Sequence, residues 1–141
     1  MEHSAMAQLA RTVINAIDTA KLNRGLRGIE WLNTKGNVAC VSGEDVVLFD
    51  YEGEGTYEGH VLMKSRGRDA LETARKALNH IFEQHEAVLV FALVPLFRKD
   101  ANIFVRWLGM NYQGDQETSE GPCALFTLSA SSWKRANQCH S

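Results

Sequence analysis

The sequence predicts a mixed α/β (α+β) fold with a single central sheet, mostly antiparallel and flanked by helices. Helix-type and strand-type hydrophobic patterns alternate along the chain, which favours one sheet with helices packed against it. Three short β-type runs are separated only by tight turns, which is typical of an antiparallel meander. The 141 residues, 45% hydrophobic and 23% charged, suit one globular domain with its own core.

The expected elements follow one another without an internal repeat. They are a helix at 4–20, a loop at 21–29, strands at 37–41, 45–51 and 56–64, a helix at 68–84, a strand at 86–94, a helix at 98–108, and strands at 110–113 and 122–129. Residues 1–130 are expected to form one domain, and residues 131–141 a short polar C-terminal tail.

The first half of the chain is justified by periodicity and turn residues. Apolar residues share one face of the first helix: Met6, Leu9, Val13 and Ile17. The loop at 21–29 is polar and holds two glycines. Glycine-containing turns at 42–44 and 52–55 separate the three strands that follow.

The second half is justified in the same way. An apolar stripe defines the helix at 68–84: Leu71, Ala74, Leu78, Ile81 and Phe82. The nearly continuous apolar run at 86–94 predicts a central strand covered on both faces. In the helix at 98–108, Ile103, Trp107 and Leu108 are expected to face inward. A polar loop at 114–121 is expected to join the last two strands.

Charge and composition exclude several classes of protein. A net charge of −2 argues against broad nucleic-acid binding. No apolar stretch approaches the roughly 18 residues of a membrane span, and the N-terminus has no signal-peptide pattern. Three cysteines without C-x-x-C spacing are typical of reduced thiols, so we expect a cytoplasmic protein. The five histidines show no metal-ligand spacing with these cysteines, and no metal site is predicted.

The most informative stretch is residues 57–78, an apolar strand, a short basic turn and a helix. The first N–H groups of a helix lack internal partners and carry partial positive charge, so they attract phosphate. Lys64, Arg66 and Arg68 add three cations, and Gly67 allows the backbone to approach a ligand. The alternative is a set of solvated residues around the start of a helix.

The order of elements over residues 30–129 resembles the GNAT (GCN5-related N-acetyltransferase) family. In that family a turn with the pattern Arg/Gln-x-x-Gly-x-Gly/Ala binds the pyrophosphate of acetyl-CoA. Arg66 matches the leading position here, but Asp69 and Leu71 stand at the two small-residue positions. Residues 104–110, Phe-Val-Arg-Trp-Leu-Gly-Met, are similar to the Leu-Gly-Phe-like step after the family's last helix.

The resemblance implies an N-acetyltransferase that binds acetyl-CoA and an amine acceptor. The implied cofactor-binding residues are Lys64, Arg66, Gly67, Arg68, Asp69 and Ala70. Two departures would weaken the site. The carboxylate of Asp69 would repel phosphate, and Arg98 stands where the family often has an asparagine near the pantetheine arm.

Acetyl transfer needs a base for the amine and often an acid for the leaving thiolate. Glu58 and His60 are two apart on a predicted strand, so they share a face, and either could be the base. The alternative is an exposed polar strand face. Tyr112 could be the acid, since a phenol has a pKa near that of a thiol.

Two other functions remain open. The scaffold could be catalytically silent and serve as a binding or assembly module, since small diverged GNAT-like chains resemble phage-encoded virion or head-assembly proteins. Such a chain would work in the host cytoplasm or the virion. A homodimer is plausible by analogy with the family. A nucleic-acid binder using Lys64, Arg66, Arg68 and Lys76 is the third interpretation.

Overall fold

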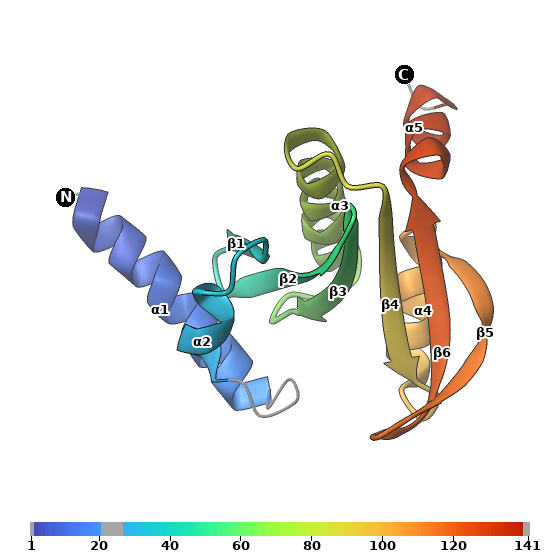
Figure 1. Ribbon diagram of the computed structural model, residues 1–141, viewed down its shortest axis with the longest axis horizontal. Helices are drawn as coiled ribbons and strands as arrows, with labels where there is room; N and C mark the ends of the chain where they lie inside the picture. The colour runs from blue at the N-terminus through green and yellow to red at the C-terminus, as the bar shows by residue number, and fades with distance from the viewer. Residues whose placement is uncertain (1, 21–26, 140–141) are drawn as a thin grey trace.

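The computed structural model describes residues 2–20 and 27–139, and Figure 1 shows the arrangement of its elements. In chain order they are α1 (Glu2–Ala20), α2 (Gly28–Leu32), β1 (Val38–Ser42), β2 (Asp45–Gly53), β3 (Thr56–Leu62), α3 (Gly67–Gln84), β4 (Leu89–Pro95), α4 (Lys99–Trp107), β5 (Asn111–Thr118), β6 (Gly121–Ser129) and α5 (Ala130–Cys139). None of the described helices combines the length and apolar character that a membrane crossing requires.

The six strands form one sheet in the order β1-β2-β3-β4-β6-β5. Every neighbouring pair is antiparallel except β3 and β4, which are parallel. The chain reaches β4 from β3 through α3, since a parallel connection needs a crossover. The sequence-based expectation of a mixed, mostly antiparallel sheet flanked by helices is confirmed.

The two faces of the sheet carry separate cores, because successive side chains of a strand point to opposite faces. Val46 and Leu48 of β2 pack with Val13 and Ile17 of α1 and with Trp31 of α2. Their neighbours in sequence face the other way, into the larger core. That core contains Val47 and Phe49 of β2, Ile81 and Phe82 of α3, and Val105 of α4. The helices α1 and α2 therefore cover one face, and α3 and α4 cover the other.

Two helices were not predicted. Residues 21–26 of the expected loop lie outside the described residues, but Gly28 begins α2. A Cβ at Gly28 would lie 2.6 Å from the Ile14 carbonyl oxygen, so only glycine lets α2 sit directly on α1. The expected polar tail, residues 131–141, is helical over its described part, because α5 runs from Ala130 to Cys139. The ring of Trp133 stacks on Phe82 with centroids 5.1 Å apart.

The expected loop at 114–121 is wrong as well. β5 continues to Thr118, and only residues 119–120 form the turn before β6. Nearly all of β5 is exposed, because it is the edge strand of the sheet. An edge strand has little core to pack against, so its polar sequence did not look like a strand.

Three burial expectations need correction. Met6 and Leu9 are exposed, because only the C-terminal half of α1 lies over the sheet. In β4, buried and half-buried residues alternate, so the strand is central but is not buried equally on its two faces. In α4 it is Val105 that faces the core, whereas Ile103 and Trp107 are exposed.

Candidate functional site

The strands β3 and β4 separate in the middle of the sheet. Their parallel ladder covers only Thr56–Glu58 and Leu89–Phe91, whereas β4 and β6 pair along seven residues. Beyond Glu58, β3 continues to Leu62 along β2. Figure 1 shows that β3 and β4 diverge there. Glu58 is thus the last residue of β3 paired with β4, and it is only 5% exposed.

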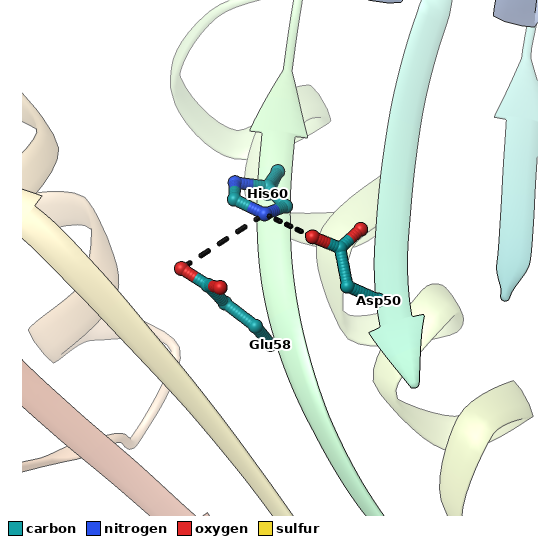
Figure 2. A group of neighbouring side chains, drawn as sticks. All are labelled: Asp50, Glu58 and His60. Carbon is teal, nitrogen blue, oxygen red and sulfur yellow. Dashed lines mark hydrogen bonds and ion pairs between the residues drawn. The ribbon is translucent and has the colours of Figure 1, made fainter. Parts of the chain in front are cut away.

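Three titratable side chains meet at this fork (Figure 2). Asp50 of β2 lies directly opposite Glu58 of β3 in the antiparallel register. The His60 ring lies between the two carboxylates, with Nε2 3.0 Å from Asp50 Oδ2 and 4.0 Å from Glu58 Oε2. On its other side, Asp50 Oδ1 accepts a hydrogen bond from the indole Nε1–H of Trp31 at 2.5 Å. A chain of polar contacts therefore runs from α2 to the fork.

Glu58 and His60 do share a face, as the period of a strand predicted. The sequence analysis missed Asp50. The predicted hairpin around 52–55 was only a partial signal, because a symmetric turn pairs residue 50 with residue 57, and the register shift between Tyr51 and Gly53 sets it opposite Glu58. Trp31 gave no comparable signal, because its role depends on how α2 packs on the sheet.

Tyr112 is not brought to this cluster. It pairs with Phe126 of β6, which in turn pairs with Ala92 of β4, and both belong to the core under α3 and α4. The Glu58 side chain points to the opposite face. The Tyr112 hydroxyl donates a hydrogen bond to Asp115 at 2.5 Å, and this bond raises the pKa of the phenol. Both facts disfavour Tyr112 as the acid.

The expected phosphate turn lies at the N-terminus of α3. Its exposed charged residues are Lys64, Arg66, Arg68 and Asp69. Gly67, the first residue of α3, has φ +62°, a left-handed conformation that glycine adopts without strain. Asp69 lies in the first turn of the helix, and Ala70 packs its methyl group into the core. Four side chains are therefore accessible to a ligand, and Ala70 offers only its backbone.

Asp45 fixes the backbone that precedes this turn, and the sequence analysis missed it. Its carboxylate accepts hydrogen bonds from the backbone N–H groups of Lys64 at 2.6 Å and Ser65 at 2.9 Å, and from the Ser65 hydroxyl. Asp45 is only 7% exposed. Burial by itself raises the pKa of this carboxyl, but the hydrogen bonds from Ser65 and Lys64 outweigh it, and the net pKa is lowered.

A groove of about 600 Å³ runs from this turn between α3 and α4. It is lined by Gly67, Arg68, Leu71, Glu72, Arg75 and Trp107. Arg75 donates a hydrogen bond to the Trp107 carbonyl at 3.3 Å and so joins the two helices. The Trp107 side chain is 60% exposed, which offers a flat apolar wall. The volume is in the range of small-molecule sites, roughly 300–1,000 Å³.

Arg98 stands at the start of α4, where the resembled family often has an asparagine. Arg98 is the residue before α4, and its backbone carbonyl accepts a hydrogen bond from Asn102 Nδ2 at 2.8 Å. The same amide nitrogen donates to the Pro95 carbonyl at 3.1 Å. The Asn102 side chain thus ties the end of β4 to the start of α4 and does not replace the missing asparagine.

Comparison with known proteins identifies the fold. No protein-family model and no curated protein matches the sequence. Solved structures do match. A point variant of spermidine N-acetyltransferase from Vibrio cholerae is similar with a TM-score of 0.70 and 9% identity, over 91% of this chain and 94% of that chain. A GNAT-family acetyltransferase from Bacillus anthracis has a TM-score of 0.56 and 18% identity, over 62% of this chain and 58% of that chain.

An aminoglycoside acetyltransferase, AAC(6')-Ib, in complex with coenzyme A and kanamycin, is also similar, with a TM-score of 0.56 and 15% identity over 66% of this chain and 63% of that chain. Across four of the matched acetyltransferases, this chain spans 55–63% of their length. At these identities the likeness shows the fold alone: a mixed sheet flanked by helices, arranged as in GNAT acetyltransferases.

Proposed function

We propose that this chain transfers an acetyl group from acetyl-CoA to an amine. The observation that carries the proposal is the position of Glu58, a buried carboxylate at the point where β3 and β4 part. The groove and the basic turn lie toward one face of the sheet, and the cluster around Glu58 lies on the other. Beyond Glu58, β3 and β4 are not paired in the described structure. No pairing of these two strands therefore separates the groove from the cluster around Glu58.

The cofactor would lie along α3. The free N–H groups of the first turn of α3, with Lys64, Arg66 and Arg68, would hold its pyrophosphate. The groove toward Trp107 would take a further part of the molecule. Asp69 opposes this binding, but it is exposed, so solvent and the three cations reduce its repulsion.

The chemistry follows from the carboxylates. An amine reaches the site as an ammonium ion, which Asp50 and Glu58 attract. Glu58 takes the proton, and the neutral nitrogen attacks the thioester carbonyl. The new C–N bond forms as the C–S bond breaks, and coenzyme A leaves as a thiolate. The second proton, which the nitrogen loses as the amide forms, passes through water to this thiolate. Of the two bases that the sequence predicted, Glu58 is the better, because His60 Nε2 lies 3.0 Å from Asp50 Oδ2 and 4.0 Å from Glu58 Oε2 and so faces two carboxylates.

A second candidate is a silent binding or assembly module with the same fold. Asp69 and Arg98 favour it, because both stand where the resembled family has residues that contact the cofactor. The two candidates differ in one property that can be measured directly, the affinity for acetyl-CoA.

Calorimetric titration with acetyl-CoA separates them. Saturable binding, with a rise in melting temperature by mass action, is expected of the enzyme. Release of free thiol is then followed with a panel of amines that includes spermidine and an aminoglycoside, the acceptors of the matched enzymes. Absence of binding at about millimolar acetyl-CoA would overturn the acetyltransferase and leave the silent module.

A further inference from the structure

We propose that Asp50, Glu58 and His60 form a binding site for a divalent transition-metal ion of the Zn²⁺ class. The proposal does not depend on acetyl transfer, because it concerns the affinity of these three side chains for a metal ion. It departs from the expectation of no metal site, which considered only the spacing of histidines and cysteines along the sequence.

The donor set and its dimensions fit such an ion. One imidazole nitrogen and two carboxylates are ordinary ligands of Zn²⁺ and Mn²⁺. One donor atom from each residue lies within 4.8 Å of the other two. His60 Nε2 lies 3.0 and 4.0 Å from the two carboxylate oxygens, and these oxygens lie within 4.8 Å of each other, so a point equidistant from all three donors is at most about 2.4 Å from each. Zinc bonds to nitrogen and oxygen are about 2.0–2.2 Å, so a small contraction completes the site.

The donors are held by the sheet and by a neighbouring side chain. Glu58 and His60 are two apart on β3, and Asp50 lies opposite Glu58 on β2, so the backbone register fixes their spacing. The Trp31 indole donates to the Asp50 oxygen that faces away from His60. Such outer contacts orient metal ligands in proteins, and their loss typically weakens metal binding about 10–100-fold.

The charge of the cluster also favours a dication. Two carboxylates directly opposite each other on neighbouring strands repel, and Glu58 is almost fully buried. A divalent ion with neutral His60 balances both carboxylates. Three protein ligands leave a coordination position open for water.

The test uses Zn²⁺ itself and the full, untagged chain after treatment with a chelator. Calorimetric titration is expected to show one Zn²⁺ ion bound at this site. The affinity for Zn²⁺ is expected to fall at least about tenfold in each of three variants, Asp50→Asn, Glu58→Gln and His60→Gln. Trp31→Phe keeps all three ligands and is expected to weaken binding less than His60→Gln does. The matched control is His80→Ala/His85→Ala, because those two Nε2 atoms lie 3.2 Å apart and form a close histidine pair outside the proposed site. A second control, Cys139→Ser/His140→Ala, removes the adjacent donors at the C-terminus.

The outcomes are distinct. Binding that survives His60→Gln but is lost in either control overturns the proposal, as does the absence of saturable binding. If a ligand variant does not fold, the wild-type chain still decides. Zn²⁺ must then shift the side-chain NMR signals of His60, and a shift confined to other histidines overturns the site. None of these readouts involves acetyl-CoA, so failure of the metal site and failure of the proposed acetyl transfer are separate results.

Discussion

The carboxylate of Asp45, the first residue of β2, accepts hydrogen bonds from both the backbone N–H and the hydroxyl of Ser65. Ser65 lies twenty residues further along the chain, immediately before the turn that starts α3. The shape of the basic turn is thus set by a buried residue that is not part of it. A phosphate site at this turn would depend on Asp45 without touching it.

The first prediction concerns stability. Asp45→Asn should lower the free energy of unfolding by about 1–3 kcal/mol at neutral pH, because hydrogen bonds to a charged acceptor become bonds to a neutral one. Urea unfolding measures the loss. Glu44→Gln, a neutral substitution of an exposed neighbour, is the control and should change little. An equal loss in both variants would contradict this role of Asp45.

The second prediction is the pH dependence of that difference. The folded pKa of Asp45 is lower than its ordinary value of 3.8, so its stabilising contribution is complete above that pH. The contribution falls as the pH drops below 3.8 toward the folded pKa, where the native carboxylate also takes up a proton. Wild type and Asp45→Asn should therefore differ by a constant amount well above pH 3.8 and approach each other as the pH falls below it. A gap that widens with acidity would refute the assignment.

Local pattern predicted most of the fold, because the pattern and the packing agree there. The continuous apolar run at 46–49 predicts a strand without any tertiary information, and in the folded sheet Val46 and Leu48 face one core while Val47 and Phe49 face the other. Only the first residues of the edge strand β5, at 111–113, were predicted, since residues 114–118 have little to pack against and carry no apolar pattern.

The candidate site shows a similar division. Glu58 and His60 were found because they lie on one strand, and the basic turn because it is contiguous in sequence. Asp45 and Asp50 act across strands, through a register that only the folded sheet supplies. Trp31 reaches the site through the packing of α2, which no local pattern encodes.

The third prediction tests Glu58 as the base. If the chain acetylates amines, Glu58→Gln should lower kcat by about 10²–10⁴-fold, because the amide cannot accept the proton of the attacking amine. The affinity for acetyl-CoA should stay within about twofold, because the side chain lies on the opposite face from the basic turn. Single-turnover kinetics and calorimetry measure the two quantities. Glu83→Gln, an exposed carboxylate of α3, is the matched control and should retain full activity.

The fourth prediction tests the basic turn with opposite charge changes. Asp69→Gly should tighten acetyl-CoA binding roughly two- to fivefold, because it removes an exposed like charge from the first turn of α3. Arg66→Ala should weaken binding roughly three- to tenfold. Both effects should shrink as salt is raised, because both charges are exposed. Arg11→Ala on α1 removes a distant cation as a control. The reverse order of affinities would place the phosphates elsewhere.

The fifth prediction uses two tryptophans that differ in burial. Trp133 of α5 is 8% exposed and stacks on Phe82, so Trp133→Ala should cost about 3–5 kcal/mol of stability. Trp107 is 60% exposed, so Trp107→Ala should cost about 1 kcal/mol or less and instead weaken acetyl-CoA binding, because it removes a wall of the groove. Urea unfolding and calorimetry on both variants provide the measurements. If α5 were a dispensable tail, the two stability losses would be equally small; if the groove held no cofactor, neither variant would change the affinity.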